Sequence, residues 1–140
     1  MTDDASTILL VEDDDATRTF LADNLTADGY DLLVADSARD GARLIETKYP
    51  DLCVVDVGLP DGSGLDLISA VRGADALFSR IDPFTPMLVL SGRAEEIDRL
   101  RGFERGADDY VAKPSARLLA PLIGGALRGQ VATGGTPCQI

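Results

Sequence analysis

The chain has 140 residues, of which 45% are hydrophobic and 26% are charged, a composition that suits one globular domain with a buried core. Its 24 acidic residues outnumber the 13 basic ones, and the formal net charge of -11 argues against direct binding of nucleic acid or anionic membranes. The sequence contains no histidine, which excludes the commonest general base, the usual zinc ligand and a phosphohistidine on this chain. Its chemistry must therefore use carboxylates, hydroxyls and lysine.

The apolar runs are too short to span a bilayer, and the N-terminal sequence MTDDAS lacks the basic and apolar regions of a signal peptide. These features predict a cytoplasmic protein. The two cysteines, Cys53 in an apolar run and Cys138 in a glycine-rich stretch, form neither a disulfide framework nor a metal-binding cluster. We interpret both as incidental.

Strand-like and helical segments alternate along the first half of the chain. A strand is predicted at residues 7–11, followed by a helix at 16–25 that ends before Gly29. A second strand at 31–35 precedes a helix behind Ser37, which has the spacing of a capping box with Asp40. The third strand, 52–55, runs directly into Asp56. A turn at 60–64 then leads to a helix at 65–71.

The same alternation continues in the second half. Strands are predicted at 87–90 and 110–112, a helical face at 97–103 that stops at Gly106, and a last helix at 118–123. The connection at 73–86 is longer than usual and carries large apolar residues, among them Phe78, Ile81 and Phe84. We expect Phe78 and Ile81 to pack on the end of the third helix or on another subunit.

Five strand–helix units with nearly continuous apolar strands predict an α/β fold: a doubly wound, five-stranded parallel sheet with five helices. Ligands of such folds bind beyond the carboxyl ends of the strands. The residues that follow the predicted strands are Glu12, Asp13, Asp56, Ser91, Gly92, Lys113 and Pro114. Taken singly, such residues are typical of helix caps or solvated surface, as are Asp14, Asp15 and Asp61. Together they indicate one site at one edge of the sheet.

Three carboxylates at one edge need a cation. Two unit charges about 4 Å apart repel by roughly 4 kcal/mol at an effective dielectric near 20, so Glu12, Asp13 and Asp56 do not stay ionised together without one. Oxygen ligands alone suit Mg²⁺ better than Ca²⁺ or zinc. A carboxylate beside Mg²⁺ and Lys113 is suited to attack phosphorus, and Ser91 can donate a hydrogen bond to a phosphoryl oxygen.

Four motifs, ILLVEDD, VVDVGLPDGSG, LVLSG and YVAKP, occur in this order between about residues 7 and 128. Together they resemble the receiver domain of two-component response regulators. The resemblance implies a flavodoxin-like sheet with strand order 2-1-3-4-5 and a receiver domain over residues 1–128. Residues 129–140 contain three glycines and no amphipathic period, which predicts a flexible tail or linker. The resemblance also implies Asp56 as the phosphoacceptor and an Mg²⁺ ion bound by Glu12, Asp13, Asp56 and the backbone carbonyl of Gly58.

The same resemblance implies a switch. Ser91 matches the switch hydroxyl, Tyr110 the switch aromatic and Lys113 the phosphate-contacting lysine. Asp56 would receive its phosphoryl group from a histidine kinase or a histidine phosphotransfer protein, and Tyr110 would then turn inward from an exposed rotamer. The surface formed by the segments near 97–106, 110–112 and 118–123 would change and be read by a partner or an output domain, or form a homodimer. On this interpretation the chain is not an enzyme for other substrates and catalyses only its own phosphorylation and dephosphorylation.

Two other functions share this layout. A phosphohydrolase of the haloacid dehalogenase type normally carries a second aspartate two residues after its nucleophile, where this chain has Gly58. A flavodoxin-like electron carrier needs a phosphate-binding loop after the first strand, where the sequence EDDD would repel a flavin phosphate. The phosphorylation switch is therefore the favoured hypothesis.

Overall fold

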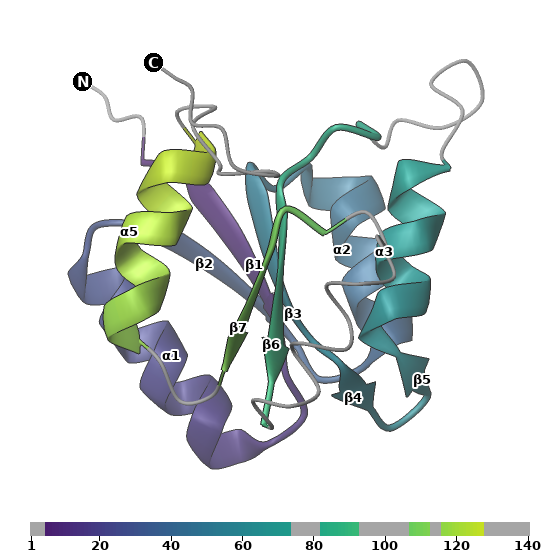
Figure 1. Cartoon of the computed structure of the whole chain (residues 1–140), viewed down its shortest axis with the longest axis horizontal. Coiled ribbons are helices and arrows are strands. Elements are labelled where there is room, and N and C mark those ends of the chain that lie inside the picture. The colour runs from purple at the N-terminus through teal and green to yellow at the C-terminus, as the bar shows by residue number, and fades with distance from the viewer. Residues whose placement is uncertain (1–4, 74–81, 93–106, 113–115, 128–140) are drawn as a thin grey trace.

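The computed structural model describes residues 5–73, 82–92, 107–112 and 116–127 (Figure 1). Five parallel strands form one sheet in the order β2-β1-β3-β6-β7, which confirms the predicted order. The strands are β1 (Thr7–Val11), β2 (Asp31–Ala35), β3 (Leu52–Asp56), β6 (Met87–Ser91) and β7 (Asp109–Ala112).

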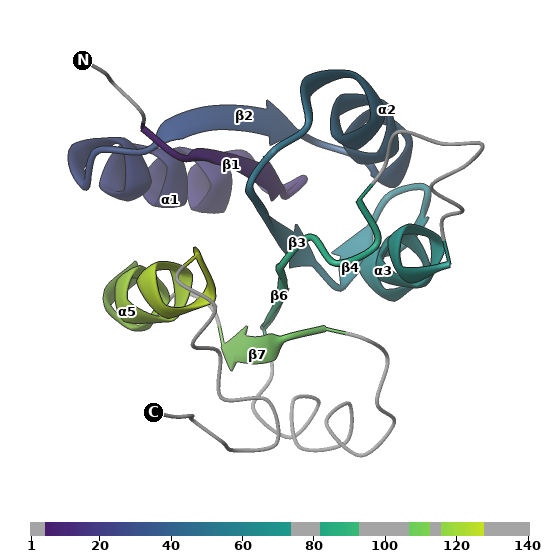
Figure 2. The same cartoon turned by 90° about the horizontal axis from the view of Figure 1, so that it is seen from above.

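Helices cover both faces of the sheet. One face is covered by α1 (Asp15–Ala27) and α5 (Ala116–Leu127), and the other by α2 (Ala38–Lys48) and α3 (Gly64–Arg72), as Figures 1 and 2 show. The doubly wound α/β fold is thus confirmed. The helix predicted near 97–106 lies outside the described residues. No helix in the described part of the chain has both the length and the apolar character needed to cross a membrane.

The strands divide the core into two clusters, one on each face. The cluster under α2 and α3 takes Leu9, Val11, Cys53 and Val55 from the two central strands β1 and β3, and the cluster under α1 and α5 takes Ile8, Leu10, Leu52 and Val54. Because both faces are covered, these strands are apolar without a break from Ile8 to Val11 and from Leu52 to Val55. Burial raises the pKa of Cys53 to about 12, so this thiol stays protonated and serves as core packing.

A short antiparallel hairpin connects β3 to α3. It consists of β4 (Gly58–Leu59) and β5 (Gly62–Ser63), with Gly58 paired to Ser63 and Leu59 to Gly62. The sequence predicted only a turn here. The side chain of Ser63 then caps α3 by accepting a hydrogen bond from the backbone N–H of Leu65 at 3.1 Å. Because β4 begins two residues after the end of β3, the hairpin lies beside the carboxyl end of that strand (Figure 1).

At the amino ends of the strands, Arg72 joins the end of α3 to the starts of β6 and β7. Its guanidinium donates to the carbonyl oxygens of Pro83 at 2.9 Å and Thr85 at 2.6 Å, and forms an ion pair with Asp108 at 3.0 Å. The same Asp108 oxygen accepts from the backbone N–H of Met87 at 2.7 Å.

Part of the long connection before β6 is also described. Phe84 is 85% exposed, so the aromatic side chain that the sequence places in this connection is not packed in the core. Arg72 instead holds the backbone at this point through the carbonyl groups of its neighbours. Phe78 and Ile81, for which packing was predicted, lie outside the described residues.

Candidate functional site

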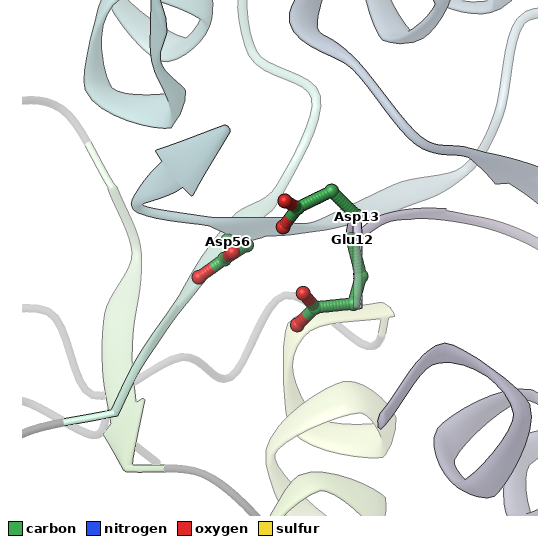
Figure 3. Close-up of side chains that lie close together, drawn as sticks. All are labelled: Glu12, Asp13 and Asp56. Atoms are coloured by element: carbon green, nitrogen blue, oxygen red, sulfur yellow. The ribbon is translucent and has the colours of Figure 1, made fainter. Parts of the chain in front are cut away.

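Three carboxylates converge at the carboxyl edge of the sheet (Figure 3). Glu12 and Asp13 directly follow β1, and Asp56 is the last residue of β3. Because β1 and β3 are paired neighbours, these ends lie side by side. One carboxylate oxygen from each residue lies within 4.8 Å of those of the other two. The structure thus brings together the three acidic residues that the sequence analysis grouped.

The three acidic side chains differ in burial. Glu12 is fully buried and Asp56 is 5% exposed, whereas Asp13 is exposed to solvent. The loop that carries Glu12 is held by α1: Arg18 donates to the Glu12 carbonyl at 2.9 Å, and the Glu12 carboxylate accepts from the backbone N–H of Asp14 at 3.1 Å. The cluster therefore has two buried acidic groups on fixed backbone and one at its solvent side.

This donor set fits a hard divalent cation. The Glu12 and Asp56 carboxylates, both buried, have oxygens no more than 4.8 Å apart and would repel each other by roughly 3.5 kcal/mol or more at an effective dielectric near 20. A cation removes that repulsion. The cluster offers only carboxylate oxygens, which are the ligands that Mg²⁺ prefers, and the exposed Asp13 leaves room for water ligands on the open side.

Ser91 lies at the same edge, on the neighbouring strand. It is the last residue of β6 and is 1% exposed. Asp56 is paired with Leu90 in the β3–β6 ladder, and the backbone N–H of Val57 donates to the Leu90 carbonyl at 3.0 Å. Ser91 is therefore one residue beyond the partner of Asp56, where its hydroxyl belongs to the same end of the sheet.

Tyr110 is buried, with 7% of its surface exposed. It is paired with Val89 and belongs to the core cluster that contains Met87 and Val89. The sequence analysis expected an exposed rotamer as the starting point of the switch, and this expectation is wrong for the conformation in the structure. Burial of the large apolar ring against β6 accounts for the difference. Lys113 and Pro114 follow β7 directly and lie outside the described residues.

Two residues near the site were not assigned to it from sequence. The Asp61 carboxylate accepts from the backbone N–H groups of Ala38 at 2.7 Å and Arg39 at 2.9 Å, and these hydrogen bonds lower the pKa of Asp61. Asp61 is thus a helix cap, but of α2 and not of the helix that follows it. Gly64 packs against the backbone of Asp56. Neither contact has a local sequence signal, because the partners are distant in the chain.

Comparisons with known proteins agree with this geometry. The family model for the response regulator receiver domain matches residues 8–121. The chain is 41% identical to the transcriptional regulatory protein AfsQ1 of Streptomyces coelicolor, over 86% of this chain and 51% of that protein. It is 39% identical to the KDP operon transcriptional regulatory protein KdpE of Escherichia coli, over 76% of this chain and 44% of that protein. The chain therefore spans about half the length of these relatives.

The fold also matches that of a solved response regulator structure. The crystal structure of a putative response regulator from Chloroflexus aurantiacus matches with a TM-score of 0.80 and 30% identity. The match covers 89% of this chain and 99% of that one.

Proposed function

The chain belongs to the response regulator receiver domain family of two-component signalling, and from this premise we propose that it is a phosphorylation switch with Asp56 as the phosphoacceptor. The observation that carries the proposal is the convergence of Glu12, Asp13 and Asp56 within 4.8 Å at the end of the central strands. Of these three, Asp56 is the one on β3, beside Ser91 of β6. That position lets a group on Asp56 be reached from the neighbouring strand.

In the proposed reaction, a carboxylate oxygen of Asp56 attacks the phosphorus of a phosphohistidine on a partner protein. The new O–P bond forms as the N–P bond breaks, and the electron pair of that bond leaves with the imidazole. Ser91 donates a hydrogen bond to one phosphoryl oxygen, and Lys113 pairs with the added charge. Glu12, Asp13, Asp56 and the Gly58 carbonyl would hold Mg²⁺, which supplies charge neutralisation for the incoming phosphoryl group.

The proposed output is a change in the surface formed by β7, α5 and the helix predicted near residues 97–106. An added phosphoryl group brings charge and acceptor oxygens, which bias the position of Ser91 and, through it, the packing beside Tyr110. We propose that a histidine kinase or a histidine phosphotransfer protein in the cytoplasm supplies the phosphoryl group. A partner, a second copy of the chain or a further domain would then bind the changed surface. Residues 1–128 would form the receiver unit and 129–140 a tail or linker.

The decisive experiment is intact mass spectrometry of the full chain after incubation with acetyl phosphate and Mg²⁺. One added phosphoryl group is expected, and none in Asp56→Asn or after EDTA treatment, because the three carboxylates repel the incoming anion without a cation. Modification that persists in EDTA would rule out the metal's part. Modification that persists in Asp56→Asn would assign the acceptor to another residue.

A further inference from the structure

The first turn of α2 has its backbone amides bound by side chains from two separate places in the chain. Such amides have no acceptor within the helix. Ser37 accepts from the N–H of Asp40 at 3.1 Å. The preceding amides, those of Ala38 and Arg39, donate to the two carboxylate oxygens of Asp61 at 2.7 and 2.9 Å. One side chain from outside the helix thus binds two amides of its start.

Asp61 belongs to the hairpin that follows Asp56, not to α2. It lies in the turn between β4 and β5, and its two hydrogen bonds reach 23 and 22 residues back along the chain. At the base of the hairpin, the N–H of Gly64 donates to the Val57 carbonyl at 2.9 Å, and Leu59 is buried in the core. The base is therefore fixed on β3 and α3, and the tip is joined to α2.

The hairpin also carries the backbone of Gly58, two residues after Asp56. Gly58 is exposed, and nothing lies within 4 Å of the position that a Cβ would take there. A backbone carbonyl has no rotatable side chain with which to adjust to an ion, whereas Mg²⁺ requires near-octahedral ligand positions. The position of the Gly58 carbonyl consequently depends on how the whole hairpin is held.

We propose that Asp61 is a positioning residue for the cation site. Its carboxylate holds the tip of the hairpin on α2 and thereby sets the backbone of Gly58. The inference rests on the proposed function for one point, which is the role of the Gly58 carbonyl as a ligand. The negative charge of Asp61 suits the positive end of the α2 dipole, so the contact is stabilising in itself. Outer contacts of this kind are known to tune metal sites strongly.

The test compares variants of the full chain by calorimetric titration with Mg²⁺. Asp61→Ala is expected to weaken Mg²⁺ binding by about tenfold. Ser37→Ala is the matched control, since it removes an amide acceptor from the same end of α2 without touching the hairpin. Asp66→Asn is the charge control, because Asp66 is an exposed carboxylate that lines the same surface hollow as Asp61. Both controls should bind Mg²⁺ within about twofold of the wild type. Ser37→Ala removes only a hydrogen bond within α2, and the exposed charge removed in Asp66→Asn is screened by salt.

The conservative variant separates hydrogen bonding from charge. Asp61→Asn keeps one oxygen acceptor for the α2 amides and should recover part of the lost affinity. It also serves as the test if Asp61→Ala does not fold. Equal losses in Asp61→Ala and Ser37→Ala would reduce Asp61 to a helix cap and overturn the proposal. Equal losses in Asp61→Ala and Asp66→Asn would reduce it to a charge effect and do the same.

A metal-free measurement separates this inference from the proposed function. Amide hydrogen exchange of residues 58–63 should become faster in Asp61→Ala than in Ser37→Ala, because only the first variant releases the hairpin tip. If the exchange rates of the two variants agree, Asp61 does not position the hairpin. If the wild type binds no Mg²⁺ while the exchange rates differ as expected, Asp61 positions the hairpin and the proposed cation site is wrong.

Discussion

Gly64 packs so closely on Asp56 that no larger residue fits: a Cβ at position 64 would lie 2.1 Å from the Asp56 carbonyl oxygen. It would also lie 2.7 Å from a methyl carbon of Val55. α3 begins at Gly64, and β3 ends at Asp56. The start of this helix and the end of this strand are therefore in backbone contact at the candidate phosphoacceptor.

Gly64→Ala is predicted to destabilise the protein, because the added methyl group must displace the backbone of Asp56. The free energy of unfolding should fall by about 1–3 kcal/mol or more, as for other overpacked sites. Urea unfolding measures the change. Gly73→Ala is the control at the other end of α3, where the nearest atom to an added Cβ is the Ser69 carbonyl oxygen at 3.4 Å. Equal stability of the two variants would contradict the close contact.

The ion pair between Arg72 and Asp108 is predicted to contribute to stability. Both side chains are about three-quarters buried, and Asp108 also accepts a backbone hydrogen bond. Asp108→Ala should therefore cost about 1.5–3 kcal/mol, the range for hydrogen bonds to charged groups. A double-mutant cycle on the pair measures the coupling energy. The cycle on Arg43 and Asp40, a more exposed pair at 3.5 Å, should give no more than about 0.5 kcal/mol.

The Asp61 carboxyl group is predicted to stabilise the fold in a pH-dependent way. Hydrogen bonds from the Ala38 and Arg39 amides hold its pKa below the ordinary value of 3.8. The ionised form is favoured in the folded state, so its contribution is complete above pH 3.8 and is lost as the pH falls through the lowered value. Titration of the carboxyl carbon chemical shift should give a midpoint below 3.8. A midpoint at or above that value would show that the two hydrogen bonds do not favour the carboxylate.

The Ser91→Ala variant is predicted to separate phosphorylation from switching. Asp56 should still accept phosphate, but the lost hydrogen bond to a charged acceptor costs about 1.5–3 kcal/mol, so coupling to β7 should fall about tenfold or more. Phosphorylation-dependent changes in amide exchange or chemical shift between residues 95 and 113 report the coupling. Ser37→Ala, which removes a hydroxyl that caps α2 and not one at the end of β6, should retain the full change. A full change in Ser91→Ala would place the switch elsewhere.

Local patterns in the sequence were sufficient to predict the five strands, whereas their order in the sheet was predicted from the resemblance to receiver domains. The five strands are short apolar runs bounded by polar residues, and the predicted strand at 52–55 differs from β3 (Leu52–Asp56) by one residue. The hairpin of β4 and β5 was not predicted, because strands of two residues have no periodicity to detect. What the sequence did supply there was the turn.

The candidate site was predictable in its members but not in its contacts. Glu12, Asp13 and Asp56 were grouped because parallel strands bring their carboxyl ends to one edge. The α2 cap by Asp61 and the contact of Gly64 with Asp56 depend on how separate elements pack, which no local pattern encodes. The predicted exposure of Tyr110 was wrong for the same reason, since the rotamer of this side chain depends on the space beside β6.

Repulsion within the carboxylate cluster lowers the stability of the folded state. In the unfolded chain Asp13 and Asp56 are far apart, and only the pairing of β1 with β3 brings their like charges together. A cation that binds the folded state alone offsets this penalty by mass action. A higher concentration of divalent cations would then raise the free energy of unfolding of the domain as well as its readiness to react. Selection for a domain that is more stable without a cation would act against the acidic residues themselves. Stability and activity therefore make opposite demands on the same three side chains.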